Sequence, residues 1–73
     1  MDITELRTVT ANALGKDPAS LPANPAWDSL DKLEIITHLH DVLGDKADEV
    51  SDLDNFVDLE SLAALLRESG LVD

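Results

Sequence analysis

The sequence predicts an all-α protein, a small four-helix bundle with three longer helices and one short helix. Apolar residues recur at intervals of three and four along three segments, which is the spacing of one helical face. Hydrophobic residues make up 44% of the chain and aromatic residues only 3%, a composition that suits helix packing better than a sheet. With 73 residues and no cysteine, the chain has room for one domain, 1–73, whose stability must come from apolar packing.

The first helix is expected over residues 3–14. Asp2 precedes it as a candidate N-cap, and Gly15 follows it where a left-handed terminating residue is favoured. The residues expected on its apolar face are Ile3, Leu6, Val9, Ala13 and Leu14. All three prolines lie between Lys16 and Ala26, which predicts an extended connection without a regular element.

The second helix is expected over residues 29–43, opening at Asp28 or Ser29 and closed by Gly44. Its apolar residues cover much of its circumference, which predicts that it packs against more than one neighbour. The residues expected to form this broad apolar stripe are Leu30, Leu33, Ile35, Ile36, Leu39, Val42 and Leu43.

An acidic loop is expected after the second helix. Ser51 and Asp54 are spaced like a capping pair, which predicts a short helix over residues 52–55. Asp58 then precedes a further periodic run, and the last helix is expected over residues 58–69, ending at Gly70.

The charge balance restricts the partners that the chain can have. Its formal net charge is −11, from 16 acidic residues against 5 Lys plus Arg, which argues against binding to nucleic acid or anionic lipid and favours basic partners. The first residues include neither a basic stretch nor an apolar run, and no segment approaches membrane-spanning length. We therefore expect a cytoplasmic protein without membrane contact.

The residues that carry chemistry are Asp28-Ser29-Leu30-Asp31-Lys32-Leu33-Glu34. A serine in the first turn of a helix lies where free backbone N–H groups and the positive end of the helix dipole favour an anion such as a phosphodiester. No histidine stands at a predictable distance from Ser29 for a nucleophilic triad, so we expect no enzyme activity and no catalytic residues. The acidic loop lacks the glycine that a calcium loop requires, so we expect no metal site.

The tripeptide Asp28-Ser29-Leu30, with acids two and five residues after the serine, resembles the 4′-phosphopantetheine attachment motif of the acyl carrier and peptidyl carrier protein family. The order of the expected elements resembles the carrier fold over most of the chain. The resemblance implies a bundle of acyl-carrier type with phosphopantetheine attached covalently to Ser29, and Asp28 as the acid that the modifying transferase uses beside its metal. The residues that it implies for partner binding are Leu30, Asp31, Lys32, Leu33 and Glu34.

The resemblance also implies a function and a set of partners. The chain would be a monomer that holds an acyl or aminoacyl group as a thioester and presents it to other proteins. These partners are a phosphopantetheinyl transferase, a loading ligase or acyltransferase, and downstream biosynthetic enzymes with basic docking patches. Lys32, His38 and His40 interrupt the acidity of the second helix, unlike in fatty-acid synthesis carriers, which favours a specialised biosynthetic pathway.

A second interpretation of the same residues is a non-enzymatic acidic helical adaptor without a prosthetic group. In that case the second helix is a protein-binding face, and Asp28 and Ser29 only cap it, which is the commonest reason for such residues before an apolar periodic run.

Overall fold

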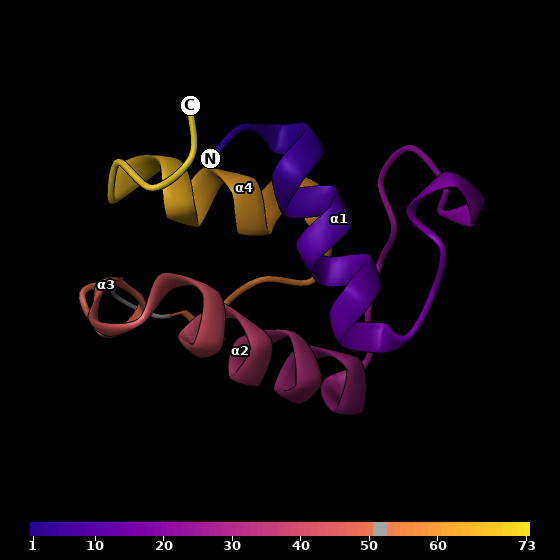
Figure 1. Ribbon diagram of the computed structural model, residues 1–73, viewed down its shortest axis with the longest axis horizontal. Helices are drawn as coiled ribbons and strands as arrows, with labels where there is room; N and C mark the ends of the chain where they lie inside the picture. The colour runs from indigo at the N-terminus through magenta and orange to yellow at the C-terminus, as the bar shows by residue number, and fades with distance from the viewer. Residues whose placement is uncertain (51–52) are drawn as a thin grey trace.

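Four α-helices form the framework of the protein in the computed structural model, which describes residues 1–50 and 53–73. They are α1 (Ile3–Leu14), α2 (Ser29–Leu43), α3 (Asp45–Asp48) and α4 (Leu59–Glu68). A single 3₁₀ turn, η1 (Pro18–Ser20), lies in the connection between α1 and α2. α1 crosses between α2 and α4 and packs against both (Figure 1). The all-α prediction is therefore confirmed for the part of the chain that the structure describes.

The limits of α1 and α2 agree with the sequence prediction because their caps form as expected. The Asp2 carboxylate accepts a hydrogen bond from the Glu5 N–H at 2.8 Å and so caps α1. Gly15 ends α1 in the left-handed conformation, with φ of 69°, where a side chain would be strained. One expected core residue of α1, Ile3, is instead exposed.

Two predictions between the long helices were wrong. The connection expected to be extended contains η1, because Pro18 fixes φ at its first position and the Asp17 carboxylate caps it through the Ala19 N–H. The segment after Gly44, expected to be a loop, forms the single turn α3, which packs against α2 and buries Ala47. One small apolar residue among charged ones gives no periodic signal in the sequence.

The short helix expected over residues 52–55 is also not found. Leu53 and Asp54 form a turn, and Asn55 has no regular structure. Ser51 and Asp52, the start of that prediction, lie outside the described residues.

The core is formed by side chains from every long helix and from the segment before α4. It includes Leu6 of α1, Ile35 and Leu39 of α2, Leu62 and Leu66 of α4, and Phe56, which is 1% exposed. Trp27 packs on this core, edge to face with Phe56, with ring centroids 5.6 Å apart. The buried Thr10 hydroxyl donates to the Arg7 carbonyl, so this polar group has a partner inside the core.

The apolar stripe predicted for α2 is only partly buried. Leu30, Leu33 and Val42 are 73%, 62% and 48% exposed, whereas Ile35 and Leu39 are fully buried. The physical reason is that α1 and Phe56 cover one side of α2, whereas these three side chains lie on its other sides and stay largely in solvent. No helix in the described ranges is long and apolar enough to cross a membrane.

α4 begins with reciprocal hydrogen bonds between Asp58 and Ser61. The Asp58 carboxylate accepts from the Ser61 N–H and from the Ser61 hydroxyl, each at 2.8 Å. The Ser61 hydroxyl oxygen in turn accepts from the Asp58 N–H at 3.1 Å. The bond from the Ser61 N–H is the main cause that lowers the pKa of Asp58 below its ordinary value of 3.8; the Ser61 hydroxyl and Asn24 add to it, and partial burial opposes it.

This lowered pKa predicts a specific acid sensitivity. Because the folded-state pKa lies below the unfolded one, Asp58 contributes stability that is fully present above pH 3.8 and is lost as the pH falls through the folded pKa. We expect Asp58→Asn, which cannot titrate, to lose less stability than the wild type over this acid range in urea unfolding. Ser61→Ala, which removes one donor, should move the loss toward higher pH. Parallel pH profiles for wild type and Asp58→Asn would contradict this prediction.

Candidate functional site

The Ser29 side chain lies at the first residue of α2 and is exposed. Asp28 precedes it with extended backbone, and its carboxylate accepts from the Asp31 N–H at 2.9 Å. The Asp28 carbonyl accepts from the Lys32 N–H at 3.0 Å and so begins the helix. Among the described residues, no hydrogen bond involves the Ser29 hydroxyl.

The segment that leads into Ser29, residues 24–29, is fixed to the start of α4; we call it the Ser29 junction. The Trp27 N–H donates to the Val57 carbonyl at 2.9 Å, and the Leu59 N–H donates to the Pro25 carbonyl at 3.0 Å. These bonds flank an isolated antiparallel bridge between Ala26 and Asp58. The chain before Ser29 is therefore held by backbone bonds to a segment about thirty residues away.

Side chains strengthen the same attachment. The Asn24 amide oxygen accepts from the Glu60 N–H at 2.9 Å, which satisfies one of the free N–H groups in the first turn of α4. Further back, the Arg7 guanidinium of α1 donates to the carbonyls of Leu21 and Ala23. The Ser29 junction is thus attached to α4 directly and to α1 through the preceding segment.

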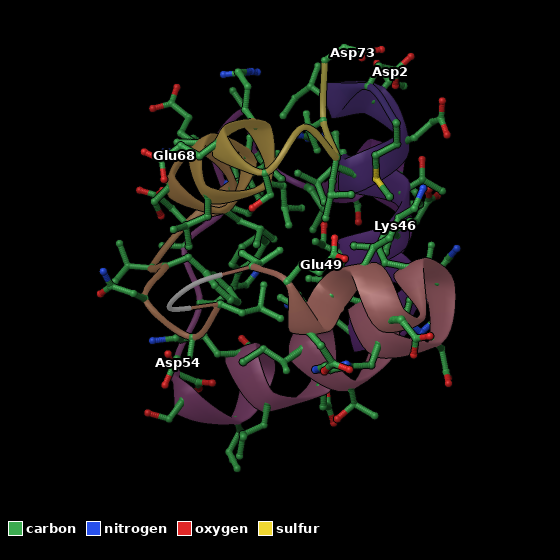
Figure 2. All side chains as sticks on the ribbon, turned by 90° about the vertical axis from the view of Figure 1, so that its left-hand side faces the viewer. Asp2, Lys46, Glu49, Asp54, Glu68 and Asp73 are labelled. Atoms are coloured by element: carbon green, nitrogen blue, oxygen red, sulfur yellow. The ribbon has the colours of Figure 1, made fainter. Side chains whose placement is uncertain are left out.

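A pocket of about 240 Å³ lies beside Ser29; we call it the Ser29 pocket. The first two turns of α2 and the segment before α4 form its walls. Its lining residues are Ser29, Lys32, Leu33, Ile36 and Asp54. Figure 2 shows Asp54 beside the first turns of α2. The pocket therefore combines the free hydroxyl, one cation, one carboxylate and an apolar wall.

Lys32 is the cation in this pocket, and it is half-buried. Its Nζ lies 5.6 Å from the centroid of the Phe56 ring, within the range of a cation–π interaction. Among the described residues, the contact within 4.0 Å between a basic side-chain nitrogen and a carboxylate oxygen joins His40 Nδ1 to Asp48, at 3.5 Å, and it does not involve Lys32.

Exposed apolar side chains surround the same helix start. Leu30 and Leu33 are 73% and 62% exposed, and Val57, whose carbonyl binds the Trp27 N–H, is 61% exposed. Large apolar side chains that remain exposed together are typical of a surface that meets another protein.

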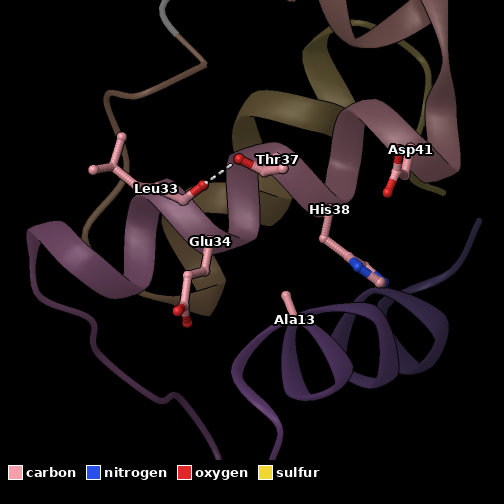
Figure 3. Close-up of a pocket in the computed structure, with 6 residues that line it drawn as sticks. All are labelled: Ala13, Leu33, Glu34, Thr37, His38 and Asp41. Atoms are coloured by element: carbon pink, nitrogen blue, oxygen red, sulfur yellow. Dashed lines mark hydrogen bonds between the residues drawn. The ribbon is translucent and has the colours of Figure 1, made fainter.

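A second pocket, of about 370 Å³, lies between α1 and α2 (Figure 3). Its lining residues are Ala13, Leu33, Glu34, Thr37, His38 and Asp41. The His38 side chain points toward α1, where Ala13 lies, and the Thr37 hydroxyl donates to the Leu33 carbonyl at 2.9 Å. The one hydroxyl in this pocket is therefore engaged, and its two carboxylates and imidazole have no activated nucleophile beside them.

The structure places the seven residues of the predicted site on the first two turns of α2 and its N-cap. Leu30, Leu33 and Glu34 are exposed, whereas Asp31 and Lys32 are half-buried. Sequence reasoning missed Asp54 as a residue of the Ser29 pocket and Phe56 as the neighbour of Lys32. No local signal could have found them, because hydrogen bonds between distant segments bring them there. In the described ranges, no group of three or more His, Cys, Asp or Glu side chains could hold a metal ion.

Comparisons of the chain with protein-family models, with curated proteins and with solved structures gave no match.

Proposed function

We propose that the chain is a discrete carrier protein of the acyl-carrier type, which holds an acyl or aminoacyl group on 4′-phosphopantetheine attached to Ser29. The observation that carries this proposal is the exposed Ser29 hydroxyl, without a hydrogen-bond partner among the described residues, at the first residue of a helix and within an Asp-Ser-Leu sequence. A serine that acted only as a cap would be expected to donate or accept a bond at the helix end. In this chain Asp28 makes the capping bond instead.

The residues around Ser29 fit a phosphate ester. The first backbone N–H groups of a helix and the positive end of its dipole favour an anion next to the first residue. The Ser29 pocket adds Lys32 as a cation and the side chains of Leu33 and Ile36 as an apolar wall. These groups suit an arm that is anionic where it is attached and less polar further along.

The phosphopantetheine group would supply a terminal thiol, on which cargo is held as a thioester. The chain supplies the Ser29 oxygen. In the attachment reaction this oxygen forms a bond to the phosphorus that carries the pantetheine part of coenzyme A, and the bond between the two phosphates of coenzyme A breaks. Adenosine bisphosphate leaves, and the transferase takes the hydroxyl proton. Asp28, next to Ser29 and exposed, is the carboxylate nearest in sequence that could assist the transferase.

The surface of the chain suits brief encounters with several enzymes. The net charge of −11 would steer it toward basic patches and make association fast and sensitive to salt. Leu30 and Leu33 would provide apolar contact beside Ser29 once a partner is bound. The partners that we propose are the transferase, a loading ligase or acyltransferase, and downstream enzymes of a specialised biosynthetic pathway.

The test is the intact mass of the protein after incubation with coenzyme A and a broad-specificity phosphopantetheinyl transferase. We expect a gain equal to one phosphopantetheine, and its complete loss in Ser29→Ala. Ser69→Ala, which changes another exposed serine at the end of α4, should gain the same mass as the wild type. An unchanged mass of the wild type with several transferases would reject the carrier proposal.

The second candidate is the acidic adaptor. Two observations favour it: the Asp28 carboxylate caps α2, and Leu30 and Leu33 are exposed on a helix that could bind a protein directly. The adaptor requires no modification of Ser29, so the same mass experiment separates the two functions.

A further inference from the structure

Lys32 stands in a special position relative to Ser29. Residues three apart on a helix are neighbours, with their Cβ atoms about 5–6 Å apart. Ser29 and Lys32 are three apart on α2, and both line the Ser29 pocket. A lysine side chain is long and flexible enough to bring its ammonium group to a substituent on the Ser29 oxygen.

The contact of Lys32 with Phe56 does not neutralise its charge, which can therefore bind an anion. Its Nζ lies over the Phe56 ring, and no carboxylate of the described residues lies within 4.0 Å of it. Asp54 is the carboxylate among the residues that line the same pocket. A charge-assisted hydrogen bond to an anion is stronger than a contact with an aromatic face, so an anion in the pocket would attract the ammonium group.

The other cations of the chain are placed elsewhere. Arg7 donates to the carbonyls of the connection after η1, and Arg67 donates to the Asp73 carbonyl. Lys16 and Lys46 are exposed, after α1 and in α3. Lys32 is thus the cation that the described structure places in the Ser29 pocket.

We infer that the Lys32 ammonium group is the counterion of a phosphate ester on the Ser29 oxygen. This inference rests on the proposed function for the identity of the ester, phosphopantetheine, but its chemistry is that of any phosphate ester at this oxygen. A new negative charge at Ser29 lies near Asp28, Asp31 and Asp54 on a chain of net charge −11. Lys32 offsets this repulsion, so that modification costs the fold little and the base of the arm is held in the pocket.

The experiment is a thermodynamic cycle that compares melting temperatures of modified and unmodified protein. The variants are Lys32→Gln, Lys32→Arg, which keeps the charge, and Lys46→Gln, which removes an exposed charge from α3. In Lys32→Gln, modification should lower the melting temperature by about 3–6 °C more than in the wild type. Lys32→Arg and Lys46→Gln should respond to modification like the wild type. Because each variant is compared with its own unmodified form, loss of the contact with Phe56 cancels.

Two sources of the ester are tested separately. One arm uses phosphopantetheine added by a transferase, and the other uses phosphoserine incorporated at position 29. A cycle difference in both arms supports the inference. A difference with phosphoserine in a protein that no transferase modifies supports the role of Lys32 and rejects the proposed function. The inference is overturned if Lys32→Gln and Lys46→Gln respond equally to modification in every arm for which modified protein is obtained. It is also overturned if phosphopantetheine has been attached and the cycle difference appears only with phosphoserine.

A measurement on the wild-type sequence removes the dependence on variants. In ¹⁵N spectra of the lysine ammonium groups, we expect the Lys32 signal to shift on modification of Ser29 and those of Lys16 and Lys46 to stay in place. A Lys32 signal that does not move would overturn the inference even if Lys32→Gln failed to fold.

Discussion

Phe56→Ala should lower the free energy of unfolding by about 3–5 kcal/mol. Phe56 is 1% exposed, belongs to the core cluster together with residues of α1, α2 and α4, and packs edge to face with Trp27 at an interplanar angle of 85°. Its truncation removes the transfer free energy of the ring and leaves a cavity between elements that cannot collapse fully. The whole stability of a chain of this length is roughly 4–11 kcal/mol, so much of it would be lost.

Urea unfolding followed by the fluorescence of Trp27, the only tryptophan of the chain, measures this effect. The matched control is Val57→Ala, which truncates the next residue, 61% exposed, and should change the free energy of unfolding by less than about 0.5 kcal/mol. Similar losses for the two variants would show that Phe56 is not the centre of the core.

Leu39→Ala should lower the free energy of unfolding by about 2–5 kcal/mol, whereas Leu30→Ala, on the same helix, should change it by less than about 0.5 kcal/mol. Leu39 is fully buried and Leu30 is 73% exposed. The two substitutions remove the same atoms from helical positions, so differences in helix propensity cancel. The difference between the two values measures burial alone, and chemical denaturation at neutral pH is sufficient to obtain it. A large loss for Leu30→Ala would mean that the first turn of α2 is covered in solution.

The limits of the long helices could be predicted because their signals are local. Asp2 and Gly15 define α1, and Asp28 with Gly44 defines α2, each through a cap that acts within one turn. α3 could not be predicted, since its one buried residue, Ala47, stands among charged residues and owes its position to packing against α2.

Which residues of α2 are buried could also not be predicted from the sequence, for a different reason. Periodicity identifies a face only when the other faces are polar, and α2 is apolar on several sides. Packing against distant segments determines which side chains of α2 are buried. α1 and Phe56 cover Ile35 and Leu39, and they leave Leu30 and Leu33 in solvent. These exposed leucines belong to the predicted partner-binding residues, whose apolar surface would contact a bound partner.

In the candidate site, too, the local sequence predicts some features, and packing between distant segments determines the others. The position of Ser29 at the start of a helix follows from Asp28 and the apolar run after it, all within a few residues. The pocket beside Ser29 includes Asp54, and the Lys32 ammonium group in it contacts the Phe56 ring. Asp54 and Phe56 belong to the segment before α4, and the sequence around Ser29 does not reveal that this segment packs against α2.

The hydrogen bonds between the Ser29 junction and the start of α4 also affect the thermodynamics of encounter. A flexible loop around Ser29 would lose conformational entropy each time a partner bound it, and that loss would weaken every complex. Here the Trp27 N–H, the Pro25 carbonyl and the Asn24 amide are already engaged within the protein. If the proposed function is right, an enzyme that approaches Ser29 would meet a segment whose backbone is already bonded, so association would require little ordering of residues 24–29.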